Sequence, residues 1–150
     1  MTMTALRFVV LLHRVGTELQ RTEHDHWDWM FQHGDVLRTW ATSPGFDLSK
    51  DVQSNCQRIA DHRLQYLDYQ GPIRNDRGDV SQVITGTWTD IAETDPGANR
   101  FAARLLIATA PGTELVQRSA QVTFQRIVDG GSDRSDEIRG DWSFRWVPGR

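Results

Sequence analysis

Polar and aromatic residues alternate most clearly around positions 24 to 32 of the chain. Successive side chains of an extended strand point to opposite faces, so His24, His26 and Asp28 would share one face while Trp27 and Trp29 share the other. Aromatic side chains favour burial. We therefore expect a half-buried strand that presents two imidazoles and a carboxylate in phase; the alternative is a water-facing polar side on which the histidines are incidental.

Short apolar or alternating runs, separated by glycine and proline turns, fill much of the remaining chain. The expected strands cover residues 6–13, 24–32, 36–42, 80–84, 86–91, 100–108, 114–128 and 141–147. A cap at Asp47 predicts a short helical turn near 48–57, and residues 63–69 are either extended or loosely helical. Strands at this spacing are typical of β-barrels or sandwiches. We expect a mainly β fold, a small closed or partly open β-barrel with one or two short helices.

Composition narrows the class of protein. The 150 residues, 38% of them apolar, fit one globular domain spanning 1–150. A formal charge of −3 argues against a broad basic surface for long nucleic-acid tracts but leaves room for a local patch. The start of the chain does not resemble a signal peptide, and no apolar run is long enough to span a bilayer. We expect a cytoplasmic, monomeric protein without membrane contact.

Several segments, taken together and in order, carry a family resemblance. They are FVVLLH at 8–13, HWDWM at 26–30 with LRTWA at 37–41, DHRLQYLDYQGP at 61–72, GTW at 86–88 and, more weakly, IRGDWSF at 138–144. This ordered set resembles the 3′-phosphoesterase domain of bacterial DNA ligase D and its small stand-alone relatives. The resemblance implies a small β-barrel with the site in its mouth, and a metal-dependent enzyme that removes 3′-phosphates or 3′-ribonucleotides from nucleic-acid ends in DNA repair.

The resemblance also implies roles for particular residues. His13, His26 and Asp28 would hold a divalent ion, most often Mn²⁺ with Zn²⁺ as the alternative, and His62 and Tyr66 would face the phosphate. Chemistry supports this assignment, because imidazole and carboxylate together suit Mn²⁺ or Zn²⁺ and three protein ligands leave positions open. A histidine titrates near neutral pH and can protonate a departing oxygen.

The chain departs from the family pattern at several positions. Thirteen positions separate His13 from His26, a longer spacing than the family's, so His24 competes for a ligand role. Met30 and Ser54 stand where the family has arginines, and the segment Ser43-Pro44-Gly45 lacks the family's lysine.

Three arginines are the candidates to replace the lost phosphate contacts. They are Arg58, Arg63 and Arg77. The missing contacts also favour an alternative function: a metal- or phosphate-binding module without turnover that recognises nucleic-acid ends or a DNA-repair protein. A weaker third hypothesis is a barrel enzyme acting on a small metabolite.

Other residues have simpler interpretations. The single cysteine, Cys56, lacks an evident activating partner and is expected to be an inert thiol rather than a nucleophile. The acidic residues between 133 and 137 lack the spacing of a calcium loop and are expected to be solvated surface. Trp88, Trp142 and Trp146 would fill the barrel core or rim rather than stack on bases.

Overall fold

The computed structural model describes residues 5–15, 24–73, 78–91, 99–110, 118–127 and 141–149. The strands in this part of the chain are β1 (Leu6–Arg14), β2 (His26–His33), β3 (Val36–Thr42), β4 (Val52–Arg63), β5 (Gly71–Pro72), β6 (Asp79–Asp90), β7 (Arg100–Thr109), β8 (Arg118–Arg126) and β9 (Trp142–Pro148). One 3₁₀-helix, η1 (Leu64–Leu67), follows β4 directly.

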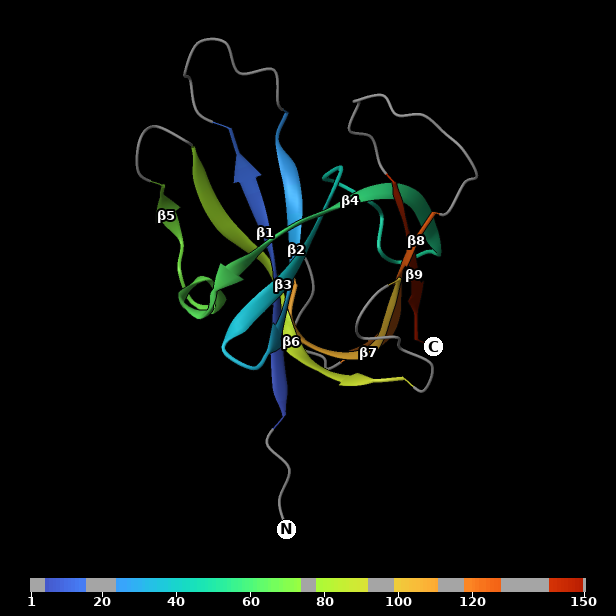
Figure 1. The fold of residues 1–150 in the computed structure, drawn as a ribbon. Helices are drawn as coiled ribbons and strands as arrows, with labels where there is room; N and C mark the ends of the chain where they lie inside the picture. The colour runs from blue at the N-terminus through green and yellow to red at the C-terminus, as the bar shows by residue number, and fades with distance from the viewer. Residues whose placement is uncertain are drawn as a thin grey trace.

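The strands form a closed antiparallel barrel. They are hydrogen-bonded in the order β1-β2-β3-β4-β9-β8-β7-β6, and the pairing of β1 with β6 closes the ring. The two-residue strand β5 pairs with the start of β6 outside this ring. In Figure 1, β4 crosses the molecule from the side of β8 and β9 to the side of β5. The predicted small, mainly β barrel with a short helix is confirmed.

Aromatic rings fill the barrel interior. Every strand of the ring contributes at least one residue to one buried cluster, in which Trp29, Phe31 and Trp40 are at most 1% exposed. The indole Nε1 of Trp29 donates a hydrogen bond of 2.9 Å to Thr42 Oγ1, so its polar atom is satisfied within the core. Three further tryptophans were expected in the core or rim, and all are buried in this cluster: Trp88, Trp142 and Trp146.

A second apolar cluster lies on the outer face of β1, β2 and β3. It joins Val9, Leu11, Met30 and Leu37, which alternate with the interior residues of the same strands, to Leu67 of η1. The same outer row continues along β1 and β2 to His13 and Asp28 by two-residue periodicity. The helix η1 thus covers apolar residues that adjoin the candidate ligands.

The expected helical turn at 48–57 is wrong. Asp47 does cap a turn, because its Oδ1 accepts hydrogen bonds from the backbone N (3.1 Å) and the hydroxyl (2.6 Å) of Ser49, but the chain is extended from Val52 onward. Val52 and Cys56 lie opposite Trp146 and Trp142 of β9. This pairing with a distant aromatic strand decides the local conformation.

A single long strand replaces the two expected at 80–84 and 86–91. β6 is continuous from Asp79 to Asp90; it pairs with β1 along one edge and with β7 along the other, and each pairing contains one irregularity. The expected strand at 114–128 is described from residue 118 to residue 126; positions 114–117 and 128 lie outside the described residues.

Gly86 marks a close contact between β6 and its neighbours. A Cβ atom at this position would lie 2.8 Å from Phe8 Cε1 and 3.1 Å from the Ile107 Cα, and still closer to the carbonyl oxygen of Leu106. Because backbone atoms cannot move aside cheaply, we expect Gly86→Ala to lower the free energy of unfolding by about 3 kcal/mol or more. Urea denaturation measures this change.

Gly34 provides the matched control for that variant. It has a φ of 66°, but no atom lies within 4 Å of the position that a Cβ would occupy there, so Gly34→Ala is expected to cost only about 1 kcal/mol. Equal stability losses in the two variants would contradict the assigned contact.

Candidate metal centre

Three side chains from β1 and β2 converge at one point. His13 and His26 are direct cross-strand partners, with ring centroids 4.7 Å apart, and Asp28 lies two residues farther along the same face of β2. One ligand atom from each of the three lies within 4.8 Å of the others. The residues predicted as ligands are therefore close enough to hold one ion.

The cluster is located on the outer face of the barrel wall. Trp27 and Trp29, which alternate with its members on β2, point into the interior cluster. The expected position in the barrel mouth is therefore corrected, because the ligand face of β2 turns away from the aromatic interior. The cluster continues the outer apolar row that ends at Met30 and Leu11.

Asp28 is a buried carboxylate with imidazoles on either side. It is 2% exposed; its Oδ2 lies 3.7 Å from His13 Nδ1 and its Oδ1 lies 3.2 Å from His26 Nε2. Burial alone would raise the pKa of Asp28, but the two histidines outweigh that effect and hold the pKa below its ordinary value. The carboxylate is therefore anionic at neutral pH and needs positive charge beside it.

The orientation of the His26 ring is a second reason why positive charge is needed beside Asp28. Its Nδ1 lies 3.0 Å from the carbonyl oxygen of His24, which can only accept, so Nδ1 carries the proton. In the neutral ring, Nε2 then turns a lone pair toward Asp28 Oδ1. That oxygen is buried and accepts no hydrogen bond among the described residues. Two acceptors facing each other at 3.2 Å require a cation between or beside them, either a proton or a metal ion.

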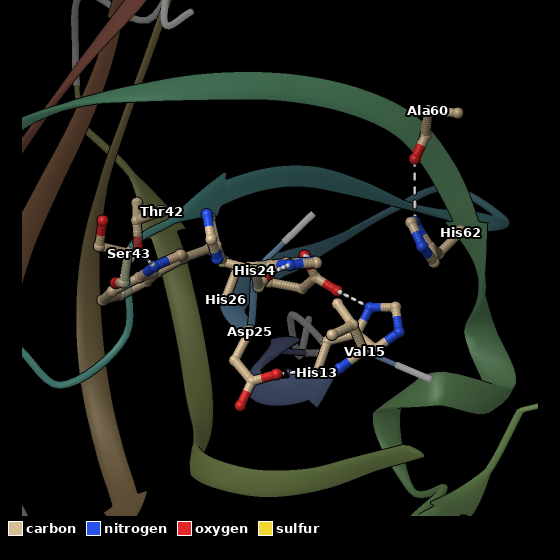
Figure 2. Close-up of polar contacts among 11 residues, drawn as sticks. His13, Val15, His24, Asp25, His26, Thr42, Ser43, Ala60 and His62 are labelled. Atoms are coloured by element: carbon tan, nitrogen blue, oxygen red, sulfur yellow. Dashed lines mark hydrogen bonds and ion pairs between the residues drawn. The ribbon is translucent and has the colours of Figure 1, made fainter. Parts of the chain in front are cut away.

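His24 has a different role from the one proposed for it. It precedes β2, its side chain is exposed, and it is not a member of the three-residue cluster. Its backbone carbonyl instead fixes the ring of His26 (Figure 2). The neighbouring Asp25 accepts a hydrogen bond of 3.0 Å from the Val15 backbone N, which joins the start of β2 to the end of β1.

An irregularity in strand pairing places His62 on the face of the cluster. Thr39 lies opposite Ile59 but Leu37 lies opposite His62, so three residues of β4 match two of β3. Without this shift, His62 would share the interior phase of Cys56. Figure 2 shows the His62 ring projecting from β4 on the side where the His13 and His26 rings lie. His62 is not part of the cluster itself.

The His62 ring is held from two directions. Its Nδ1 lies 2.9 Å from the carbonyl oxygen of Ala60 and therefore donates to it, and its ring meets Tyr66 edge-on at 5.6 Å between centroids. Tyr66 in turn contacts Tyr69, whose hydroxyl donates to the Pro72 carbonyl oxygen. Tyr69 was not predicted as a site residue, although its spacing of three residues from Tyr66 could have indicated it.

Arg58 and Arg63, two of the three arginines proposed to replace the missing phosphate contacts, lie on the opposite face of β4 from His62. Arg58 lies opposite Trp40 on the interior phase of β4, with its guanidinium 4.9 Å from the Trp40 ring centroid. Arg63 is the exposed residue before η1, and in an extended strand its side chain leaves on the face opposite to that of His62. Arg77 lies outside the described residues.

Cys56 is buried in the barrel interior. Loss of solvation, with a smaller contribution from the negative charge of Asp141, raises the pKa of the thiol to about 12. Such a thiol remains protonated at neutral pH, in agreement with the expectation that it is not a nucleophile.

Within the described ranges, no helix has the length and apolarity needed to cross a membrane.

Comparison with known proteins identifies the family of this chain. No curated protein matches the chain. The family model of the DNA ligase D 3′-phosphoesterase domain matches residues 19–125, which is more than half of the 150 residues and includes His26, Asp28, His62 and Tyr66. The chain therefore belongs to the DNA ligase D 3′-phosphoesterase domain family.

Proposed function

We propose that this protein is a metal-dependent phosphoesterase that removes phosphate or a ribonucleotide from the 3′ ends of nucleic acid in DNA repair. It would act in the cytoplasm, as a monomer whose single domain carries the whole site. The observation that carries the proposal is the buried Asp28 Oδ1, which accepts no hydrogen bond within the described chain and faces His26 Nε2 at 3.2 Å. A member of this family with such a carboxylate is suited to hold a cation there.

The residues present fit a divalent ion. His13, His26 and Asp28 would hold it, and two imidazoles with one carboxylate suit Mn²⁺ or Zn²⁺ while leaving coordination positions for phosphate or water. The Nδ1 hydrogen bond of His26 to a carbonyl oxygen is the arrangement usual for metal-bound histidine. When bound, the ion would withdraw charge from a phosphoryl group and lower the pKa of a bound water.

His62 and Tyr66 would act on the substrate rather than on the ion. Because the His62 Nδ1 donates to Ala60, its Nε2 remains to receive or deliver a proton. In the protonated form it would donate a hydrogen bond to a phosphate oxygen and release the proton to the departing 3′ oxygen. The edge contact with Tyr66 would keep the ring in that orientation.

The direct test is an assay on a primer that ends in a 3′-phosphate. We expect release of inorganic phosphate with added Mn²⁺ and a loss of release in EDTA. A primer with a 3′-hydroxyl and a 5′-phosphate is the matched control and is expected to remain intact. Equal hydrolysis of both phosphates, or hydrolysis that is unaffected by EDTA, would contradict the proposal.

The apolar surroundings of the cluster favour a second candidate function. Met30, where the family pattern has an arginine, is 1% exposed and packs with Val9, Leu11 and Leu37, and Arg58 lies on the other face of β4. Charge-assisted contacts to phosphate contribute about 1.5 to 3 kcal/mol each. If these contacts are lost, the protein would be a module that binds 3′ ends without hydrolysing them. Metal-dependent binding of the phosphorylated primer with no phosphate release would favour this module.

A further inference from the structure

The neighbouring strands β7, β8 and β9 have an unusual charge composition. Their sequences are RFAARLLIAT, RSAQVTFQR and WSFRWVP, and they contain no aspartate or glutamate. Their arginines are Arg100, Arg104, Arg118, Arg126 and Arg145. The whole chain has a formal charge of −3, whereas these three strands carry five arginines and no carboxylate side chain.

Strand periodicity determines which of these arginines share a face. Phe101 of β7, Val122 of β8 and Phe144 of β9 point into the interior cluster, so Arg104 and Arg145, in the opposite phase, lie on the outer face. Both side chains are exposed. We call the outer surface of β7, β8 and β9 the basic face.

The residues between these two arginines are neutral. Arg104 lies opposite Gln121, and Arg145 lies opposite Thr123, on either edge of β8. Two strand spacings and two residues along a strand separate the arginines by about 12 Å. Each strand of duplex DNA carries one phosphate per about 3.4 Å of axis, so this span covers several phosphates. Amides and hydroxyls between the cations can donate to phosphate oxygens.

Carboxylates do not neutralise the basic face within the described chain. Among the described residues, neither Arg104 nor Arg145 forms an ion pair, whereas Arg7 on β1 pairs with Asp68 at 2.7 Å. Exposed arginines without a counter-ion are available to a polyanion.

Two adjoining hollows lie along the edge of the basic face. One, of about 340 Å³, is lined in part by Lys50, Arg118 and Trp146 and includes one acidic residue, Asp51. The other, of about 330 Å³, includes Arg104. Ser119 and Gly149 belong to both, where the Gly149 backbone N donates to the Ser119 carbonyl oxygen at 2.7 Å. Cationic side chains thus line two hollows that have Ser119 and Gly149 in common.

We propose that the basic face is a second contact surface for the phosphate backbone of nucleic acid, separate from the metal centre. In the ring of strands, β8 is four steps from β2 in either direction, so the two sites lie on opposite walls. The basic face therefore contacts nucleic acid that extends beyond the processed 3′ end. The inference that the basic face binds a polyanion rests on its charges alone, whereas the choice of nucleic acid as that polyanion rests on the proposed function.

The test measures binding of a labelled oligonucleotide of about 40 nucleotides in EDTA, so that neither metal nor hydrolysis contributes. We expect the double variant Arg104→Gln with Arg145→Gln to bind about tenfold more weakly. The slope of log affinity against log salt should fall by about 1.4, since each lost contact to a single strand removes about 0.7.

Two controls distinguish electrostatic contact from structural damage. Arg104→Lys with Arg145→Lys keeps the charges and is expected to retain most of the affinity. Arg7→Gln removes the same kind of charge from β1 and is expected to bind as the unchanged protein does. Circular dichroism verifies that every variant is folded.

Several outcomes would overturn the proposal. They are unchanged affinity and salt slope in the double glutamine variant, an equal loss in Arg7→Gln, or binding of the unchanged protein to anionic lipid vesicles or an acidic polypeptide but not to the oligonucleotide. A failure of the proposed phosphoesterase function would appear instead as absent hydrolysis at the metal centre. The binding measurement in EDTA is independent of that result.

Discussion

Asp28→Asn is expected to abolish metal-dependent hydrolysis of a 3′-phosphate while the barrel remains folded. The variant keeps the size of the side chain but removes the charge that two imidazoles now surround. Loss of a residue that only supports a ligand lowers metal affinity by about 10- to 100-fold, so loss of a ligand should lower it by about 100-fold or more. Turnover at a fixed low Mn²⁺ concentration should fall at least as far.

Thermal unfolding with and without Mn²⁺ measures this effect independently of turnover. At a hundred times its dissociation constant, a ligand stabilises the folded state by about 2.7 kcal/mol, and Asp28→Asn should lose that gain. Asp25→Asn is the matched control, because Asp25 is exposed and accepts only the Val15 backbone N among the contacts described. An equal Mn²⁺-induced shift in Asp28→Asn and the unchanged protein would contradict the assigned site.

His62→Ala is expected to lower kcat by about 100-fold or more without weakening metal binding. General acid catalysis contributes about 10²- to 10⁴-fold, and His62 shares the outer face with the cluster without belonging to it. Steady-state kinetics on the phosphorylated primer measures the loss, and the Mn²⁺-induced shift in thermal unfolding tests the metal site separately.

His24→Ala is the matched control for that variant. His24 is exposed, and the hydrogen bond described between it and His26 uses its backbone carbonyl, so truncation of the side chain should leave both kcat and the metal-induced shift unchanged. If His62→Ala lowered metal affinity as much as His26→Ala does, His62 would be a ligand and the assignment of roles would be wrong.

The local sequence pattern was sufficient to predict the first three strands of the barrel. Residues in β2 alternate without interruption, so the phase that joins His26 to Asp28 could be predicted before any partner strand was known. The strand β4 could not be predicted in this way. Val52, Ser54 and Cys56 become a strand because aromatic residues of β9, some ninety positions away, lie opposite them.

The sequence also predicted only part of the candidate site. Period-two alternation indicates which side chains share a face, but it does not say whether that face turns inward or outward. The irregularity between Leu37 and Thr39 is equally invisible in the sequence, and it moves His62 to the outer face while Arg58 stays on the inner one. For this reason Arg58 lies on the opposite face from the cluster, although it is close to His62 in sequence.

One ion held by His13, His26 and Asp28 is the central claim, and anomalous diffraction from crystals soaked in Mn²⁺ tests it most directly. The predicted result is one strong peak at the Mn edge within about 2.3 Å of a nitrogen of each histidine and of a carboxylate oxygen of Asp28. A peak elsewhere on the barrel, with these three side chains unchanged and in contact only with water, would contradict that claim.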